Sequence, residues 1–283
     1  MTATATDPRL GEGSDPAVLL ERRGGVLVLT LNRPDKLNAW NAAIDTAFRA
    51  AMADAAEDPE VRAVVVTGAG RGFCSGADMS ELGDIADGGA PERTDEPRVP
   101  ATLRDKPVVV AVNGIAAGMG LAQVLWADVR FASPDARFLT AFSRRGLVAE
   151  YGTSWLLQRL VGTSRAADLL LSSRMVGAAE AHRIGLVDHL VEDGDVREAA
   201  IAYAADLATW CSPTSMRLIK QQLRDDAERG LDDAVLDADR MMHASFRAPD
   251  LLEGVRAYAE RRPPEFPGIP GTSAGAPTPT KET

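Results

Sequence analysis

The sequence has few cysteines, few aromatic residues and no long apolar run. Only Cys74 and Cys211 are cysteines among 283 residues, which excludes a disulfide-stapled fold and favours a reducing compartment. No apolar stretch approaches the roughly 20 residues that a membrane-spanning helix needs. The opening residues, Met1 to Pro8, have neither the basic start nor the apolar segment of a secretory signal. We therefore expect a cytoplasmic protein without a membrane partner.

Positive charge is also in short supply. The 31 Lys and Arg residues face 41 Asp and Glu residues, for a formal net charge of -10. Nucleic-acid binding depends on clustered Lys and Arg that displace counterions, so we expect no nucleic-acid partner. The three histidines, His182, His189 and His243, lack ligand spacing, and we expect no metal site. Local pairs such as Arg144-Arg145 still leave room for a small ligand with phosphates.

What is present is an alternation of strand-like and helix-like segments. Runs at 17–22 and 26–31 predict two strands joined by a hairpin turn at Gly24-Gly25. Further strands are expected at 63–67, at 108–112 and near 129 and 138, and helices are expected from 41, 121 and 152 and at 178–183, 196–210, 213–229, 231–246 and 251–262. This order predicts an α/β protein whose back third is a helical layer.

Composition also suggests a division of the chain. Residues 1–16 and 267–283 are rich in Pro, Gly, Ser and Thr, and we expect both to be disordered tails. Between them we expect a core at 17–200 and a C-terminal helical region at 201–266. The segment 83–100 has many Gly, Pro, Asp and Glu residues and few apolar ones, which predicts a mobile surface loop able to gate a pocket.

Two glycine-marked turns carry the strongest chemical signal. One, at 76–78, follows the apolar run 63–67, and the other, at 118–120, follows the apolar run 108–112. A turn that leads from a strand into a helix leaves backbone N–H groups unpaired, with the positive end of the helix dipole behind them. Two such turns can converge on one oxygen and stabilise an oxyanion. Ordinary tight strand-to-helix connections would need the same glycines.

Four sequence blocks, in this order and spacing, resemble the crotonase superfamily, and the chain looks like an enoyl-CoA hydratase/isomerase. The blocks are LNRPDKLNA at 31–39, FCSGADM at 73–79, KPVVVAVNG at 106–114 and GMG at 118–120. With RLVG at 159–162 and the helix at 253–262, the similarity covers residues 17–266. It implies a crotonase-like spiral of ββα units with two packed sheets, followed by a C-terminal helical trimerisation layer, and an assembly that is a homotrimer or homohexamer.

The resemblance also implies the site residues. The N–H groups of Ala77 and Met119 would hold the thioester oxygen of an acyl-CoA substrate and stabilise its enolate; the family usually has glycine at the second position. Substrate or coenzyme A contacts are implied for Lys36, Leu37, Ala77, Asp78, Met79, Gly118, Phe142, Tyr258 and Arg261. The last two often reach a neighbouring subunit, although Tyr258 also suits core packing and Arg261 a helix C-terminus. No cofactor is implied, because coenzyme A is part of the substrate.

The departure from the family concerns its acids. The two glutamates of the hydratases would fall at Ala122 and Phe142, and neither residue can transfer a proton. Gln123 has no titrating group. Glu150, just before a predicted helix, resembles the acid that enoyl-CoA and dienoyl-CoA isomerases use to move a proton along the acyl chain, and apolar neighbours would raise its pKa. An acidic residue in that position is also a common partner of a helix dipole.

We therefore expect an enoyl-CoA isomerase with Glu150 as its single base. Three alternatives stay open: an enoyl-CoA hydratase, a catalytically weak acyl-CoA binding protein, and a nucleophilic enzyme such as a hydrolase or dehalogenase. Cys74 lies beside the first turn, but no histidine near it in sequence would activate the thiol, so packing is favoured over nucleophilic catalysis.

Overall fold

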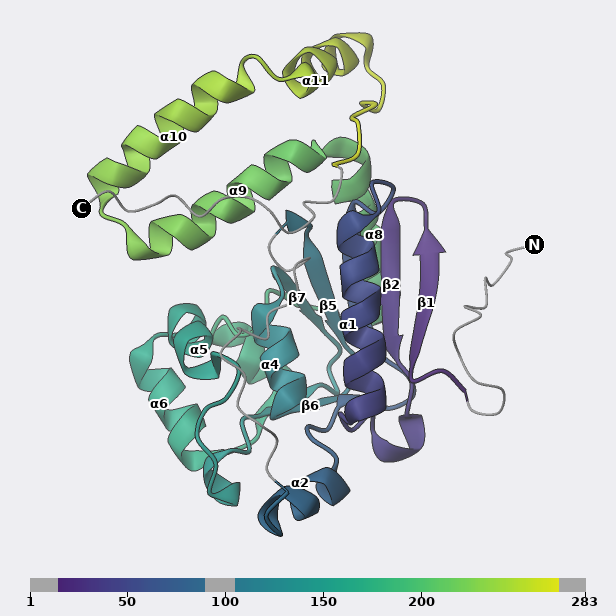
Figure 1. Cartoon of the computed structure of the whole chain (residues 1–283), viewed down its shortest axis with the longest axis vertical. Coiled ribbons are helices and arrows are strands. Elements are labelled where there is room, and N and C mark those ends of the chain that lie inside the picture. The colour runs from purple at the N-terminus through teal and green to yellow at the C-terminus, as the bar shows by residue number, and fades with distance from the viewer. Residues whose placement is uncertain (1–14, 90–104, 270–283) are drawn as a thin grey trace.

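The computed structural model describes residues 15–89 and 105–269. Two β-sheets and their covering helices form an α/β core, and the last helices extend from one end of it (Figure 1). None of the helices in these two ranges combines the length and the apolar character that a membrane crossing demands. The tails expected at 1–16 and 267–283 lie almost wholly outside the described ranges.

The larger sheet has six strands in the order β1-β2-β3-β5-β7-β10. Their bounds are Val18–Arg23 for β1, Val26–Leu31 for β2, Ala63–Gly68 for β3, Val108–Val112 for β5, Val129–Ala132 for β7 and His189–Leu190 for β10. The hairpin expected at Gly24 is confirmed: β1 and β2 are antiparallel, and Gly24 has a φ of +58°. All other neighbours are parallel. Parallel strands are joined by crossover connections, usually helices, and these helices cover both faces of the sheet.

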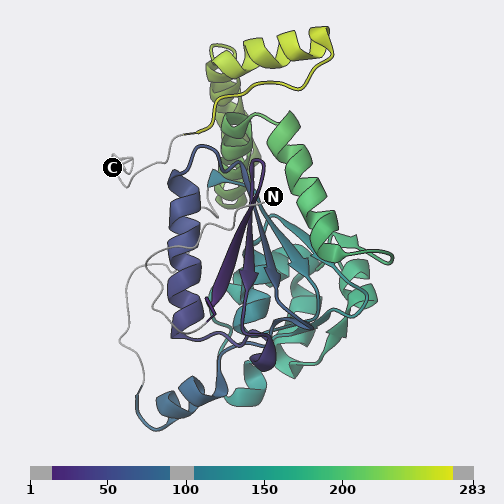
Figure 2. The same cartoon turned by 90° about the vertical axis from the view of Figure 1, so that its right-hand side faces the viewer.

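Helices α1 (Ala42–Glu57) and α8 (Val196–Trp210) cover opposite faces of this sheet, which Figure 2 shows nearly edge-on. Strand β2 shows why: its side chains alternate, so Leu27, Leu29 and Leu31 join the core on the α1 side, while Val26 and Val28 join the core on the α8 side. Because both faces are buried, the strand is apolar at nearly every position.

The smaller sheet has four strands in the order β4-β6-β8-β9. They span Gly72–Cys74, Ile115–Ala117, Arg137–Leu139 and Val176–Gly177. The chain alternates between the sheets, since β3 is followed by β4, β5 by β6 and β7 by β8, and helices α2 (Met79–Ala86) and α4 (Met119–Trp126) follow β4 and β6. This is the expected spiral of ββα units, and the fold class is confirmed.

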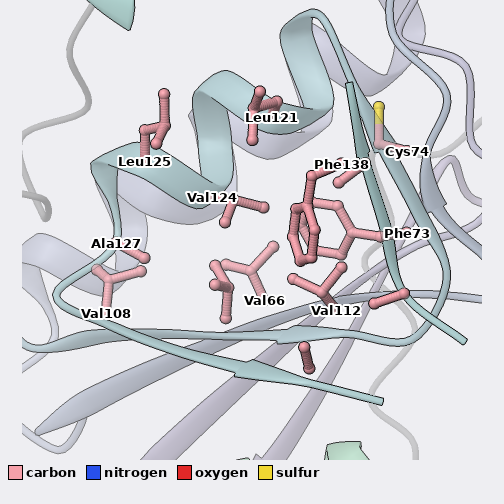
Figure 3. Packing of buried hydrophobic residues seen from close by; sticks show 14 of the residues in the cluster. Val66, Phe73, Cys74, Val108, Val112, Leu121, Val124, Leu125, Ala127 and Phe138 are labelled. Carbon is pink, nitrogen blue, oxygen red and sulfur yellow. The ribbon is translucent and has the colours of Figure 1, made fainter. Parts of the chain in front are cut away.

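Helix α4 packs into the space between the two sheets. Figure 3 shows Leu121 and Val124 of this helix pointing toward Phe73 and Phe138 of the smaller sheet, and Val66 of the larger sheet lies beside them. All five side chains are at most 2% exposed. Burying a side chain of this size contributes about 1.5–3 kcal/mol, so the start of α4 is held firmly against both sheets.

Helix α8 alters the expected division of the chain. The boundary placed between residues 200 and 201 falls inside this helix, whose Ala200, Ile201, Ala204 and Ala208 are buried against the larger sheet. The core therefore extends to Trp210. Helices α5 (Thr153–Val161), α6 (Thr163–Ser172) and α7 (Ala178–Arg183) complete it.

Helices α9 (Pro213–Asp225), α10 (Leu231–Ser245) and α11 (Pro249–Glu260) form the C-terminal layer. Two cationic side chains attach it to the core: the buried Lys220 donates through Nζ to Lys106 O at 2.7 Å and pairs with Asp128 at 2.5 Å. The guanidinium of Arg62 donates to Phe266 O at 2.6 Å. Helix α10 has no buried residue and lies farther from the core than α9 in Figure 1.

Sequence patterns missed four short strands, although the three-residue β8 was expected near 138. Strands β4, β6, β9 and β10 are two or three residues long, too short to show a period. The loop expected at 83–100 begins later than predicted, because α2 continues to Ala86. The Glu81 carboxylate in its first turn accepts the Ala42 N–H at 3.0 Å and so ties α2 to α1. Residues 90–100 of that loop lie outside the described ranges.

Candidate active site

Three chain segments meet at one edge of the smaller sheet. Strands β4, β6 and β8 run parallel side by side, with Cys74 beside Ala116 and Ala117 beside Leu139. Parallel strands end at the same edge, so the turns that follow them become neighbours. The first turn at 76–78 therefore lies next to the second at 118–120, and the segment after Leu139 lies on the other side of the second turn.

Contacts between glycines show how closely the two turns approach. A Cβ placed on Gly76 would lie 3.1 Å from Ala117 O and 3.9 Å from Gly118 Cα. A Cβ placed on Gly120 would lie 2.3 Å from Cys74 O, closer than any real side chain can come. The start of α4 therefore rests directly on the end of β4, and only glycine permits this approach.

In both turns the peptide plane is fixed by a hydrogen bond to its carbonyl oxygen. Trp40 N donates to Gly76 O at 2.7 Å, and Ala122 N donates to Gly118 O at 2.9 Å. In a trans peptide the carbonyl and the N–H point in opposite directions. The N–H of Ala77 therefore points away from Trp40, and the N–H of Met119 points away from the body of α4. Each hydrogen bond thus fixes the direction of the N–H in the same peptide unit.

Methionine at position 119 does not disturb this geometry. Met119 is the first residue of α4, whereas the unusual conformation falls on Gly118, with φ 48° and ψ -113°. Among the described residues with positive φ, Met119 is absent. The glycine that the turn needs is therefore Gly118, and the backbone conformation of position 119 does not require glycine.

The segment at 36–38 lies against the first turn. Leu37 O accepts the Ser75 N–H at 3.0 Å, and Lys36 O accepts the Ser75 hydroxyl at 3.3 Å. The fully buried Asn38 amide donates to Gly72 O at 2.8 Å. This segment includes two residues with positive φ, Leu37 and Asn38, so the bonds hold an unusual backbone beside Ala77.

Glu150 lies in the loop that leads into α5. Its backbone oxygen accepts the Thr153 N–H at 2.9 Å, and Trp126 of α4 donates its indole N–H to Tyr151 O at 2.9 Å. The loop is thus tied to the helix whose first residue is Met119. The side chain is half-buried, and this burial raises the pKa of the Glu150 carboxyl.

Comparison with known proteins identifies the family. The family model described as enoyl-CoA hydratase/isomerase matches residues 21–269. The chain belongs to the enoyl-CoA hydratase/isomerase family. The 1,2-epoxyphenylacetyl-CoA isomerase of Escherichia coli is 37% identical over 253 residues, covering 86% of this chain and 95% of that protein. A protein of Rhodobacter capsulatus named as a probable enoyl-CoA hydratase is 39% identical over 250 residues, with the same coverage of both chains.

Solved structures of the family share the fold. A probable enoyl-CoA hydratase/isomerase from Mycobacterium abscessus superposes with a TM-score of 0.82 at 33% identity, over 89% of this chain and 99% of that one. An enoyl-CoA hydratase from Mycobacterium tuberculosis gives a TM-score of 0.81 at 31% identity, over 90% and 100%. The crotonase superfamily resemblance is therefore confirmed, while the relatives' names include both isomerase and hydratase.

The two positions expected for the hydratase glutamates are apolar and buried in this family member. Ala122 is fully buried and Phe142 is 5% exposed. Gln123, the neighbour of Ala122, is half-buried and its amide lies 3.6 Å from Met119 Sδ. These three side chains offer no titrating group beside the second turn.

The first turn brings several predicted contact residues together. Ala77 and Met79 are exposed, with Met79 at 64%. Asp78 Oδ2 accepts a hydrogen bond from each terminal nitrogen of Arg33, both at 3.0 Å, and these bonds lower the pKa of the Asp78 carboxyl. The motif at 31–39 contains Arg33, but nothing in the sequence assigned it this role. The ion pair joins that motif to the motif at 73–79.

Cys74 is a core residue. Its side chain is fully buried, and burial raises the pKa of the thiol to about 11. A thiol that stays protonated at neutral pH is a weak nucleophile, which agrees with the packing role expected from the sequence.

Tyr258 and Arg261 are not brought to this site within one chain. They lie on α11 and at its end, and α11 and α2 occupy opposite ends of the molecule in both views (Figures 1 and 2). Tyr258 is 87% exposed, so it does not pack in the core of its own chain, and Arg261 caps α11 in a left-handed conformation. A contact with coenzyme A would require a neighbouring copy.

Proposed function

We propose that this protein is an enoyl-CoA isomerase that moves a double bond through an enolate. The observation that carries the proposal is the pair of fixed main-chain N–H groups at Ala77 and Met119, combined with the half-buried carboxyl of Glu150, whose pKa burial raises. The family relationship supplies the acyl-CoA substrate class. The apolar residues Ala122 and Phe142 favour isomerisation over hydration, because hydration uses two acids and a water.

The proposed reaction is a proton shift with no net gain or loss of atoms. The Glu150 carboxylate takes a proton from the α-carbon of a 3-enoyl-CoA, and the electron pair moves onto the thioester oxygen. The N–H groups of Ala77 and Met119 stabilise that oxyanion. The protonated Glu150 then returns the proton to the γ-carbon, which gives the conjugated 2-enoyl-CoA.

The environment of Glu150 suits this double task. A group that must act first as a base and then as an acid works best when its pKa is closer to neutrality than that of an ordinary carboxyl. Burial raises the pKa of Glu150 in that direction. Its loop is fastened to α4 through Trp126, so base and second donor belong to one connected unit.

Matched 3-enoyl-CoA and 2-enoyl-CoA thioesters test the proposal in deuterated water. We expect interconversion of the two isomers with deuterium at the α and γ carbons, measured by NMR and mass spectrometry. Formation of 3-hydroxyacyl-CoA instead would identify a hydratase. Thioester binding without deuterium incorporation would identify a binding protein, and a covalent acyl-enzyme would identify nucleophilic catalysis.

We also propose that the C-terminal layer is the surface through which copies of this chain form a trimer or hexamer. A groove of about 710 Å³ lies between α9, α10 and α11, and most of its lining is apolar. The exposed apolar side chains around it include Phe246, Val255 and Tyr258 at 57%, 61% and 87% exposure. Exposed apolar patches of this kind mark association surfaces, and association would bring Tyr258 and Arg261 to a neighbouring copy.

Sedimentation of the purified chain tests this surface. We expect a trimer or hexamer, and we expect Val255→Asp to shift it toward the monomer, because association would bury an unpaired charge. Leu20→Asp, on the edge strand β1 at 50% exposure, is the matched control and should leave the assembly intact. A monomeric parent chain would contradict the proposal.

A further inference from the structure

Three hydroxyl groups form a connected chain behind the second turn. Thr140 Oγ1 donates to Leu169 O at 2.9 Å and lies 3.1 Å from Ser173 Oγ, which lies 2.9 Å from Ser143 Oγ. Thr140 is 2% exposed and Ser173 is fully buried. These hydrogen-bonded hydroxyls join the segment after β8 to the end of α6.

The segment that these hydroxyls hold is bonded directly to the second turn. Leu139 O accepts the Gly118 N–H at 2.9 Å, and a Cβ placed on Gly118 would lie 3.9 Å from Thr140 O. The Gly118 backbone is therefore packed against residues 139 and 140. Because the ψ angle of Gly118 sets the direction of the next peptide plane, a shift of this segment would rotate the N–H of Met119.

Strained backbone accompanies the hydroxyl chain. Ser173 adopts φ 44° and ψ 40°, and Ala141 has a φ of 66°. This left-handed region costs free energy for any residue with a Cβ and none for glycine. Ser173 ends α6 in this conformation, and its N–H donates to Leu169 O at 3.1 Å. Glycine is the usual residue at such a helix end, so what serine adds there is the hydroxyl that reaches Thr140.

The number of hydroxyl protons decides which residue donates each hydrogen bond. Each hydroxyl has one proton to donate, and Thr140 gives its proton to Leu169 O, since a carbonyl can only accept. The contact between Thr140 and Ser173 must then be donated by Ser173. The Ser173 hydroxyl therefore donates the second hydrogen bond of the Thr140 hydroxyl. The Ser143 hydroxyl can then donate either to Ser173 Oγ or to Leu171 O, which lies 2.9 Å from it.

We propose that Thr140 and Ser173 are positioning residues for the second oxyanion donor: their hydroxyl chain fixes the segment after β8, and that segment aims the N–H of Met119 at the thioester oxygen. This inference rests on the proposed function, because it requires a thioester oxygen bound by that N–H. Neither side chain touches the substrate, and their effect reaches it only through the Gly118 backbone.

Two variants that remove a hydroxyl test this inference. Thr140→Val keeps the branched shape, and Ser173→Gly removes the hydroxyl together with the strain, so the fold should tolerate it. For both we expect kcat to fall about tenfold with little change in KM, less than the 100- to 1,000-fold loss of a whole oxyanion donor. The carbonyl stretch of a bound ¹³C-labelled acyl-CoA, read by difference infrared spectroscopy, should move back toward its value in water.

Controls separate positioning from general stability. Thr140→Ser keeps the hydroxyl and should therefore keep the kcat and the carbonyl frequency of the parent protein. Thr67→Val removes a similarly buried hydroxyl, which donates to Ala111 O at 2.9 Å in the larger sheet, and should leave the carbonyl frequency unchanged.

The outcomes distinguish the two proposals. If the parent protein does not shift the carbonyl frequency of the bound thioester, the proposed function fails. If the parent protein shifts it and both Thr140→Val and Ser173→Gly preserve the full shift and kcat, the positioning role is overturned while the proposed function stands.

Discussion

Glu150→Gln should abolish double-bond migration while leaving thioester binding intact. Glutamine has the size of glutamate but cannot accept and return a proton at neutral pH. General acid–base groups contribute typically 100- to 10,000-fold, so kcat should fall by about that factor. Steady-state turnover of a matched 3-enoyl-CoA measures the loss, and the Kd of a non-reactive acyl-CoA, measured by calorimetry, should stay within about twofold of the parent value.

Stability provides the control for this variant. Because burial raises the pKa of Glu150, the folded protein binds that proton more tightly than the unfolded chain, and stability is lost as the pH rises through the raised pKa. Replacing the charged carboxylate at neutral pH should therefore leave the free energy of unfolding unchanged or slightly higher. Glu192→Gln, an exposed residue beyond β10, should change neither turnover nor stability. Unchanged turnover in Glu150→Gln would remove this residue from the mechanism.

The pH dependence of the parent enzyme should report the same group. The base must be ionised to take the first proton, so kcat/KM should fall as the pH is lowered through the pKa of Glu150. Since burial shifts that pKa upward from 4.5, the acidic limb should lie above the range of an ordinary glutamate. A limb at or below 4.5 would show that another group titrates.

Gly120→Ala should separate the two proposed oxyanion donors and inactivate the enzyme. The new Cβ would lie 2.3 Å from Cys74 O and 2.7 Å from Cys74 Cβ, and main-chain atoms cannot rotate out of its way. Helix α4 would have to move from β4, carrying Met119 away from Ala77. Loss of one oxyanion donor costs about 100- to 1,000-fold in kcat, and overpacking adds about 1–3 kcal/mol of destabilisation.

A matched glycine controls for the added methyl group. Gly177, the last residue of β9, has an ordinary φ of -80° and no atom within 4 Å of a built Cβ, so Gly177→Ala should retain activity and stability. Chemical denaturation shows how much of Gly120→Ala is folded, and turnover is then compared per folded molecule. Parent-like turnover in the folded Gly120→Ala fraction would show that the approach of the two turns does not matter for catalysis.

Sequence patterns predicted the long strands and helices well, because a buried face requires apolar residues at recognisable positions. The nearly continuous apolar run of β2 reflects a strand buried on both faces, and the recurrence of Ile44, Phe48, Ala51 and Met52 in α1 reflects the face that this helix buries. Elements of two or three residues left no period to read. The boundary at residue 200 was misplaced because α8 packs on a sheet formed by residues far away in sequence, which composition alone does not reveal.

The sequence alone determined the family, the glycine turns and the apolar residues at the two positions expected for the hydratase acids, since each depends only on which residues stand in which order. Tertiary structure decided what those residues can do together. Parallel pairing of β4, β6 and β8 places three strand ends at one edge, and hydrogen bonds from Trp40 and Ala122 orient the two peptide planes. Burial shifts the pKa of Glu150. These effects arise between residues distant along the chain, because only folding brings them within contact distance.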